Sequence, residues 1–561
     1  MKKYLSAVLI CVLVVGLLAG CTGTTTTTTA SGTTKATTTS GTTTGGTTTG
    51  GTTTSTGAEP GPNFKFDPPI TITIVDQDVA AASGGAWDNE DNAWIDLYRD
   101  RYGINLEYMW IVDSAQYTER VNLMLAGGDV PDFFNANAIQ FQQAFEYGLI
   151  QAVDEVFDMY TTQTTKDLMM EAGMMPFEAC MRDDKMYAIP WTTLAHESAN
   201  VIHVRQDWLD LLGAEPLTTF QNLEAYFAAV KDKKPGGVAW SISEDSGLSR
   251  LMAMAPMFGA FPDHWVEMPD GSLQHGVLQP EMKEAVAQFA AWFEAGYIDP
   301  EFGTSSGTKR AENIAAGTVG FNMDPFWHPL AWQAAKNNDS KCELSFFEMP
   351  TKSGQPFIFP SVGVGVAGYY LTSGTCEHPE AFPLMLNSFM EIFYLSTDKD
   401  EGEKYINWAD GTPIWQAAFA KAYRHYKNYQ QSKDIAKYLD KAMSFDDLPA
   451  DTKNVASRID EFMAGDNSTW GWYQIYGPGR IFTPVGKIID DKRFHDNAFY
   501  GPTPQSMTDY QAILDKLELE TFTSMITGGK DVAEWDSFVT QWYDLGGKDI
   551  TDDVNEWKKR K

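Results

Sequence analysis

Short apolar runs alternate with amphipathic stretches along most of the chain. Ile70–Val75 is rich in β-branched residues and Ile104–Trp110 has a similar pattern, so both runs predict strands. Between them, apolar side chains recur around Trp94 and Tyr98 at the spacing of one helix face. Asp132–Phe134 predicts a short third strand. Strands that are separated by helices in this way predict an α/β fold with mostly parallel sheets.

The later part of the chain carries strong helix signals. Pro280 is expected to begin a helix with one apolar face, and Gly296 is expected to end it. Apolar side chains also recur at helical spacing in 510–517 and 535–542. No internal repeat and no second linker interrupts the sequence after residue 62. This part is therefore expected to form one compact unit with interleaved lobes.

The N-terminal segment has a different pattern. Lys2-Lys3 precedes the apolar run Leu5–Leu18, which is too short to span a bilayer but fits the apolar region of a signal peptide. The run ends in Leu18-Ala-Gly-Cys21, which resembles the bacterial lipobox. That resemblance implies that residues 1–20 are removed as a lipoprotein signal peptide and that Cys21 carries the lipid. The alternative is an ordinary secretory signal in which the cysteine is incidental.

Residues 21–62 are expected to form a tether between the lipid and the folded part. After the cysteine they are almost entirely Thr, Gly and Ser. Such a segment has no apolar surface whose burial could offset the entropy of folding. We therefore expect a disordered linker.

Composition narrows the function classes. The 561 residues include 42 Lys and Arg against 75 Asp and Glu, a formal net charge of −33. Such a surface repels phosphate backbones and anionic headgroups, so no nucleic-acid partner is expected. The cysteines beyond the N-terminal segment are Cys180, Cys342 and Cys376, and their spacing fits neither a disulfide framework nor a zinc site. We expect buried thiols, with at most one bridge among them.

Three segments match catalytic or cofactor-binding patterns but lack the surroundings that these patterns need. Gly363-Val-Gly-Val-Ala-Gly368 has the spacing of dinucleotide-binding glycines, but Tyr369–Thr372 predicts a strand where a helix would have to bind the pyrophosphate. Residues 303–307 fit a nucleophile elbow without the buried strand before it, and His196-Glu197 lacks the second histidine of a zincin. We expect no enzyme activity, no cofactor and no metal, and we expect 363–368 to cross between lobes.

Several short segments resemble one family. Asp183-Asp-Lys-Met-Tyr-Ala-Ile-Pro190 is similar to the strand that crosses between the lobes of extracellular solute-binding proteins of carbohydrate ABC transporters, and Val204–Gly213 follows it as in that family. The other similar segments are 125–132, 294–300, 316–321, 497–499, 522–523, 542–547 and 554–557. The resemblance covers nearly all of 68–558. It is closest to the large lipoprotein subgroup of Gram-positive bacteria that is often called LipO-like.

This resemblance implies a class II periplasmic-binding-protein fold, in which two α/β lobes hold a ligand in the cleft between them. The chain is expected to cross between the lobes near 187–198, 317–328 and 362–372. The predicted lobes, given by the stretches of chain that they contain, are 68–190 plus 320–365 and 195–316 plus 370–561.

The resemblance also implies a function. A monomer, held at the outer face of the cell membrane by its lipid, would capture a sugar or oligosaccharide and deliver it to the permease subunits of an ABC transporter. A neutral sugar is compatible with the acidic surface. Two alternatives stay open, namely an extracellular polysaccharide-active enzyme (a glycoside hydrolase or lyase) and a sensory module that hands its ligand to a receptor kinase. A peptide or lipid ligand is a further alternative.

Sugar-binding residues are expected where strands and crossings end, because ligands of open α/β sheets bind there. Planar aromatic side chains cover the C–H faces of a sugar, and carboxylates or amides bind its hydroxyls. The candidates are Asp76, Gln77, Asn135, Asn137, Trp191, Asp324, Trp327, Tyr369, Tyr370, and the pair Trp470 and Trp472 in an aromatic loop. Trp327 stands where relatives carry a stacking aromatic. For each tryptophan the alternative is packing in the core.

Overall fold

The first three predicted strands lie in one five-stranded sheet. In the computed structural model, β1 (Ile70–Gln77) pairs in parallel with β2 (Ile104–Val112) on one side and with β3 (Phe133–Ala136) on the other. β14 (Val366–Thr372) and β6 (Ile189–Thr192) complete the order β2-β1-β3-β14-β6, and both of these pairings are antiparallel. The three strand predictions are confirmed.

The structure describes residues 59–79, 88–171, 173–194, 196–234, 237–240, 248–302, 307–361, 363–407 and 413–561. All of them belong to one compact unit, Ser55–Lys561. The predicted signal peptide, Cys21 and the tether up to residue 58 lie outside the described residues. Among the described helices, none is long and apolar enough to cross a membrane.

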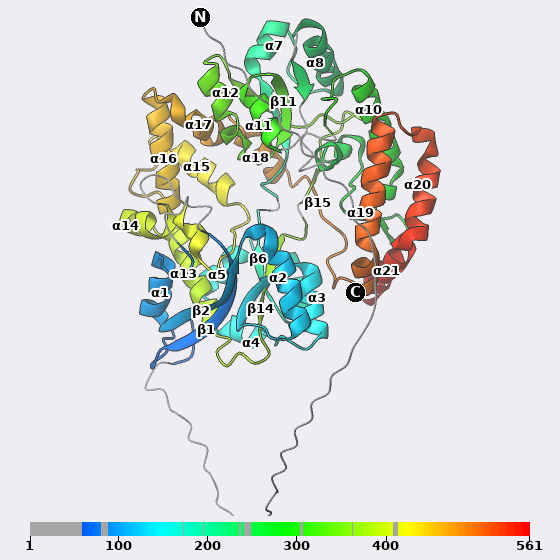
Figure 1. Ribbon diagram of the computed structural model, residues 1–561. Coiled ribbons are helices and arrows are strands. Elements are labelled where there is room, and N and C mark those ends of the chain that lie inside the picture. The colour runs from blue at the N-terminus through cyan, green and yellow to red at the C-terminus, as the bar shows by residue number, and fades with distance from the viewer. Residues whose placement is uncertain are drawn as a thin grey trace, which may run out of the picture. The chain divides into compact units, whose positions relative to one another are not determined.

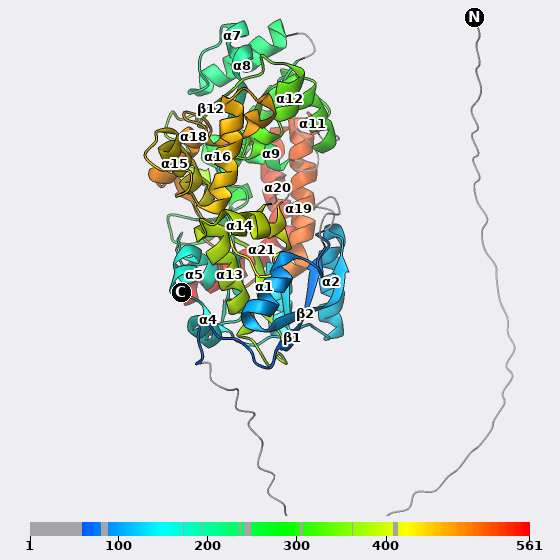
Figure 2. The ribbon, with the colours of Figure 1, turned by 90° about the vertical axis from the view of Figure 1, so that its left-hand side faces the viewer.

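Helices from distant parts of the sequence cover the five-stranded sheet. α1 (Ala93–Tyr102) begins where the Asn92 side chain accepts hydrogen bonds from two backbone N–H groups, and it ends at Gly103, whose φ of 70° suits glycine. α13 (Ala381–Leu395) lies beside α1 in both views (Figures 1 and 2). The resulting core joins 66–189 to 369–422, and we call this part the first lobe.

A second, four-stranded sheet has the order β12-β7-β11-β8. Its strands are β7 (Val201–Arg205), β8 (Val238–Trp240), β11 (Val319–Asp324) and β12 (Leu344–Phe347). β7 pairs antiparallel with both β11 and β12, and only β8 and β11 are parallel. Its core spans 199–359 and 435–554, which we call the second lobe. The expectation of mostly parallel sheets is therefore wrong here, because β7 enters this sheet from the first lobe rather than through a helix on the same sheet.

The predicted division of the chain between the lobes needs correction. Residues 320–365 were expected in the first lobe, but β11 and β12 both pair with β7 in the second sheet. All six residues of β11 are buried, as is usual for a central strand covered on both faces. The stretch from 370 was expected in the second lobe, but 369–422 packs in the first core.

Three segments cross between the lobes. Residues 193–200 connect β6 to β7, and residues 361–365 lead into β14 from β13 (Phe359–Pro360), which pairs with β15 (Phe494–His495). The third crossing, 423–426, precedes α15 (Lys427–Leu439). The predicted crossings near 187–198 and 362–372 overlap the first two. The predicted crossing at 317–328 is wrong, because this stretch contains β11.

The helix that Pro280 was expected to begin is confirmed as α10 (Pro280–Glu294). The two stretches with helical spacing near the C-terminus lie in α19 (Gln505–Ile526) and α20 (Trp535–Trp542). Cys180, Cys342 and Cys376 are buried and free, as expected. The other helices are α2 (Ser114–Gly127), α3 (Ala138–Glu146), α4 (Asp154–Tyr160), α5 (Gln163–Met169), α6 (Met175–Glu178), α7 (Gln206–Leu212), α8 (Phe220–Lys233), α9 (Ser249–Met252), α11 (Gly307–Ala315), α12 (Gln333–Asn338), α14 (Lys399–Glu401), α16 (Ala450–Met463), α17 (Trp470–Tyr476), α18 (Phe482–Asp490), α19 (Gln505–Ile526), α20 (Trp535–Trp542) and α21 (Lys548–Arg560). The short strands are β4 (Met181–Arg182), β5 (Lys185–Met186), β9 (Trp265–Glu267) and β10 (Leu273–His275).

Candidate functional site

A pocket of about 340 Å³ lies at the carboxyl ends of β1 and β3 in the first lobe. Because β1 and β3 are parallel, their last residues reach the same edge of the sheet. Five of the predicted ligand-binding residues line the pocket, namely Asp76, Gln77, Asn135, Trp191 and Tyr370. The structure therefore brings together candidates from four different strands.

Aromatic rings form one wall of the pocket. The rings of Trp191 and Tyr370 are stacked, with centroids 5.9 Å apart and planes inclined by 25°. Tyr423 lies 6.1 Å from Trp191 and 6.0 Å from Trp415, measured between ring centroids. Planar faces of this kind suit ligands with flat apolar surfaces, such as the C–H faces of a pyranose or furanose ring.

Two hydrogen-bond donors in this wall have no partner among the described residues. Asn135 Nδ2 and Trp191 Nε1 are both buried, and neither donates a hydrogen bond. A buried donor without an acceptor costs about 1–3 kcal/mol, so such groups are rare unless something else binds them. Both donors belong to residues that line the pocket. Unpartnered indole N–H groups also occur in the core, at Trp208 and Trp332, so it is the position at the pocket that links Asn135 and Trp191 to a ligand with hydrogen-bond acceptors.

Asp76 and Lys421, which both line the pocket, bring opposite charges to it. Burial raises the pKa of the Asp76 carboxyl, while the charge of Lys421 and the Gln77 backbone N–H, 2.8 Å away, act in the other direction. Burial lowers the pKa of Lys421, and Asp76 opposes that shift. Lys421 Nζ donates to the backbone oxygens of Gln416 at 2.8 Å and Ala418 at 2.9 Å. The pocket therefore offers both a strong acceptor and strong donors, which is the pattern that hydroxyl groups need.

Sequence reasoning missed nine of the fourteen residues that line the pocket. The residues it did not name are Asp78, Val79, Ser114, Tyr117, Trp415, Gln416, Phe419, Lys421 and Tyr423. Most of these follow α13, in the stretch that was assigned to the wrong lobe. The available signal was the density of aromatic residues between Trp415 and Tyr423, which has neither helical nor strand periodicity.

Two first-lobe candidates lie outside this pocket. The Asn137 side chain accepts from the Gln140 backbone N–H at 2.9 Å, and Gln140 in turn accepts from Asn137 N, so Asn137 caps α3. Tyr369 neighbours Tyr370 on β14, so their side chains point to opposite faces of the sheet. Its ring stacks on Phe141 at 5.0 Å. Both predictions are corrected, because these side chains have structural contacts instead.

Asp324, the last residue of β11, is fully buried and already neutralised. Its carboxylate forms ion pairs with Arg250 and Arg310, and His328 Nδ1 lies 3.3 Å from it. Burial acts to raise the pKa of Asp324, but Arg310, His328 and Arg250 outweigh it and hold the pKa below its ordinary value. The prediction that Asp324 binds ligand is therefore corrected, because the side chain has no exposed surface.

The three tryptophans that were predicted to bind ligand from the second lobe, Trp327, Trp470 and Trp472, have different surroundings. Trp327 precedes the short helix His328–Leu330, is 42% exposed, and contacts Phe326 edge to face at 5.1 Å. Trp472 is half-buried on α17, stacked against Tyr476. The predicted aromatic loop is therefore a helix. Only Trp327 retains a large exposed surface.

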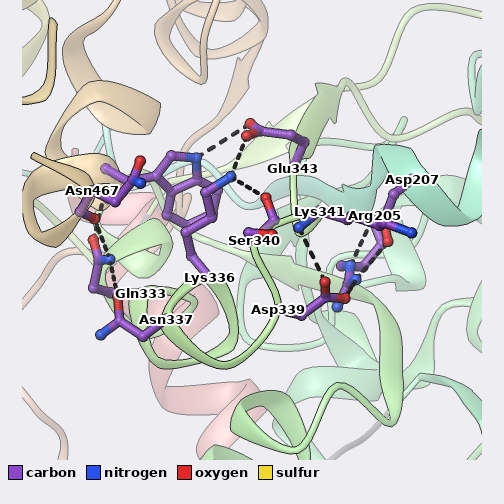
Figure 3. A network of polar contacts seen from close by, with 12 residues as sticks. Arg205, Asp207, Gln333, Lys336, Asn337, Asp339, Ser340, Lys341, Glu343 and Asn467 are labelled. Carbon is purple, nitrogen blue, oxygen red and sulfur yellow. Dashed lines mark hydrogen bonds and ion pairs between the residues drawn. The ribbon is translucent and has the colours of Figure 1, made fainter. Parts of the chain in front are cut away.

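Trp470 belongs to a small core instead of a ligand site. It is fully buried, and its Nε1 donates to Glu343 Oε2 at 3.2 Å. Lys336 Nζ bonds Glu343 Oε1 at 2.6 Å and lies 5.7 Å from the centre of the Trp470 ring. Figure 3 shows Lys336 and Glu343 pointing toward each other in this network. The prediction for Trp470 is corrected, because its ring is fully buried and its indole N–H already has Glu343 as acceptor.

A two-lobed α/β fold with a polar and aromatic pocket at its strand ends defines a ligand-binding protein. The chain belongs to the bacterial extracellular solute-binding protein family, whose sequence pattern matches residues 93–424. It is 25% identical over 219 residues to the fructooligosaccharide ABC transporter substrate-binding protein FusA of Streptococcus pneumoniae. That alignment covers 36% of this chain and 40% of FusA, so it spans less than half of the relative.

Solved structures support the fold over most of the chain. The alginate-binding protein AlgQ2 superposes with a TM-score of 0.61 at 16% identity, covering 89% of this chain and all of that one. FusA in complex with kestose gives 0.56 at 16% identity, covering 88% and 99%. An HMO-binding, ABC-transporter-associated solute-binding protein of Bifidobacterium longum infantis gives 0.58 at 13% identity, covering 87% and 98%. At these identities the likeness shows a common fold.

The contrast between Trp470 and Trp327 gives a stability prediction. Trp470→Ala should lower the free energy of unfolding by about 3–5 kcal/mol, because it removes a fully buried ring and leaves Glu343 without its indole partner. Trp327→Ala should cost much less, since its ring is substantially exposed. Urea denaturation of both variants measures the difference. Equal losses in the two variants would show that the assignment of core and surface is wrong.

Proposed function

We propose that this protein is the substrate-binding component of a carbohydrate ABC transporter, which captures an oligosaccharide outside the cell and delivers it to the permease subunits. The observation that carries this proposal is the first-lobe pocket, where the unpartnered donors Asn135 Nδ2 and Trp191 Nε1 lie beside an aromatic wall. Sugars present apolar C–H faces and hydroxyl groups side by side, and few other ligands need both features at such short range.

The charges of the pocket support an uncharged polar ligand. Asp76 accepts hydrogen bonds, and Lys421 donates them, so a pair of neighbouring hydroxyls satisfies both groups without bringing a net charge into the pocket. The family membership supports capture rather than chemistry. FusA, by its name, binds fructooligosaccharides for an ABC transporter. We take these compounds as the first ligands to test.

The second lobe would complete the site. Trp327 is its exposed candidate, and we propose that it contacts the ligand that the first-lobe pocket holds. A ligand that touches both lobes favours the arrangement in which both contacts are made, by the difference in its affinity for the two arrangements. Binding would thereby be coupled to the relative position of the lobes, which a permease can recognise.

We also propose that the protein acts as a monomer at the outer face of a cell membrane, through a lipid on Cys21. The lipobox-like sequence and the tether-like residues 22–62 support this anchor. Cys21→Ala should abolish incorporation of labelled palmitate in a Gram-positive host and move the protein from the membrane fraction to the medium or to an unprocessed precursor. Lys35→Ala, in the tether, should leave both properties unchanged. Palmitate labelling of the Cys21→Ala protein would contradict the anchor.

The binding proposal is tested by melting and titration. A ligand at about 100 times its Kd adds about 2.7 kcal/mol to the stability of the folded state, so a panel of fructooligosaccharides, other oligosaccharides and peptides should raise the melting temperature only with sugars. The sugar should be recovered intact. Stabilisation by peptides alone would overturn the proposal, and cleavage of the sugar would favour a polysaccharide-active enzyme.

Trp191→Ala should weaken binding of the stabilising sugar about 5- to 150-fold, the loss of one ring contact worth roughly 1–3 kcal/mol. Trp557→Ala is the matched control, because this half-buried indole on α21 packs on Phe499 and does not line the pocket. Calorimetric titration measures both variants. An unchanged Kd in Trp191→Ala would place the sugar elsewhere.

A further inference from the structure

Four of the chain's eight histidines meet where the polypeptide crosses between the lobes. His196 is on the first crossing and His425 on the third, and their ring centroids are 5.5 Å apart. His264 and His495 belong to the second lobe, with ring centroids 5.3 Å apart. Asp496, next to His495, lies 3.3 Å from His196 Nε2 and so connects the two pairs. We call these four side chains the histidine cluster.

The hydrogen bonds of His264 fix its tautomer. Its Nε2 lies 2.8 Å from the backbone oxygen of Ser361 on the second crossing, and a carbonyl can only accept, so Nε2 carries the proton. In the neutral ring, Nδ1 is then an acceptor. It lies 3.0 Å from His495 Nδ1, which must therefore be the donor. The bond needs one of these two nitrogens without a proton, so it is kept when one ring takes up a proton and lost when both rings do.

This pair holds the second crossing against the second lobe. The Ser361 backbone N–H donates to the His495 oxygen at 2.9 Å, in continuation of the β13–β15 pairing. The His495 ring stacks on Phe261 at 3.9 Å. His264 and His495 thus both bond Ser361, the first residue of the second crossing, and Phe261 packs on the His495 ring.

The second pair ties the first crossing to the third. His196 Nδ1 bonds the Tyr426 hydroxyl at 2.9 Å, and its ring stacks on Phe494 at 4.1 Å. The His425 ring is so close to Gly365 on the second crossing that a Cβ there would lie 3.1 Å from it. All three crossings therefore contact the cluster, and two of its members, His196 and His425, line a small cavity with Pro176 of the first lobe.

We propose that the histidine cluster is a pH-sensitive joint, whose protonation in mildly acidic surroundings loosens the crossings and changes the relative position of the two lobes. With both rings protonated, two N–H donors would face each other at 3.0 Å, so the bond between His264 and His495 would be lost and the Ser361 segment released. This inference is independent of which ligand the protein binds.

The groups that face the cluster set the direction of the response. Burial lowers the pKa of His264, and it lowers the pKa of His425 to about 3 and of His495 to about 4. The charged and titratable groups around the four rings are Asp496 after β15, Glu197 beside His196, Tyr426 and the Arg424–Glu171 ion pair at the third crossing, and His275 on β10. Asp496 has a lowered pKa, first because of its hydrogen bond with His196, and stays charged.

The sign of the effect follows from these directions. The described arrangement favours neutral rings at His264, His425 and His495. Its free-energy advantage over an arrangement that exposes these rings to water is therefore complete above the ordinary histidine pKa of about 6.5. Below that pH, the population of an arrangement that exposes one of these rings to water, relative to the described arrangement, rises about tenfold per pH unit until the pKa of the buried ring is reached. At about pH 5 the gain is roughly 30-fold for His425 and for His495, whose folded pKa values lie below 5.

The experiment measures the distance between the lobes in the ligand-free chain. Spin labels are placed at the exposed positions Glu155→Cys on α4 and Lys516→Cys on α19, in a Cys21→Ser background in which the remaining described cysteines are buried. Pulsed electron resonance should give a distance distribution that differs between about pH 8 and pH 5, the range in which histidine changes its charge. An identical distribution at both values would overturn the proposal.

Variants assign the response to the cluster. His264→Gln/His495→Asn keeps an amide donor for the Ser361 oxygen, and neither new side chain can take up a proton, so the pH response should shrink to the part that His425 contributes. His378→Gln, at a partly exposed histidine of the first lobe, should respond like the parent chain. A pH response that is undiminished in the double variant would contradict the proposal. If that variant melts early at pH 8, His495→Asn alone serves, and it should lose most of the response.

Discussion

The pocket depends on the position of β14 between β3 and β6. In this register Tyr370 lies opposite Asn135, and Gly368 lies opposite Trp191. Three segments that are remote in sequence therefore deliver their side chains to the edge where β1 ends. A Cβ at Gly368 would approach the Asn135 amide oxygen to 2.6 Å, so the glycine leaves room for the Asn135 side chain.

The same strand explains the glycine pattern that imitates a dinucleotide-binding motif. Gly363 and Gly365 have φ values of 58° and 78°, which turn the second crossing into the sheet. Gly368 has no room for a side chain. Each glycine thus has a structural reason, since residues 363–365 lead into β14 and Gly368 lies within this strand of the first sheet.

The sequence predicted the elements with simple periodicity and failed where pairing is decided at long range. β1, β2 and β3 were recognised from their apolar runs, and the strand-end rule located Asp76, Gln77 and Asn135 in the pocket. The segment from Trp415 to Tyr423 has no period, and its place in the first lobe follows from packing behind α13. β11 was misplaced because a buried central strand has the same apolar sequence in either lobe.

Tryptophan identity alone did not separate core from site. Trp470 begins α17 and Trp191 lies within β6, and Trp470 Nε1 has Glu343 as acceptor, whereas Trp191 Nε1 has no partner among the described residues. Trp191 also lines the pocket and Trp470 does not, and no local sequence pattern encodes this difference.

This distinction allows a direct measurement of the central claim, that the first-lobe pocket binds the sugar. In a spectrum of the indole N–H groups, assigned with Trp191→Phe and Trp470→Phe, the Trp191 proton should move downfield as an oligosaccharide is added and supplies the missing acceptor. The Trp470 signal should stay in place, because its hydrogen bond already exists. A sugar that binds while the Trp191 signal remains unchanged would contradict the account.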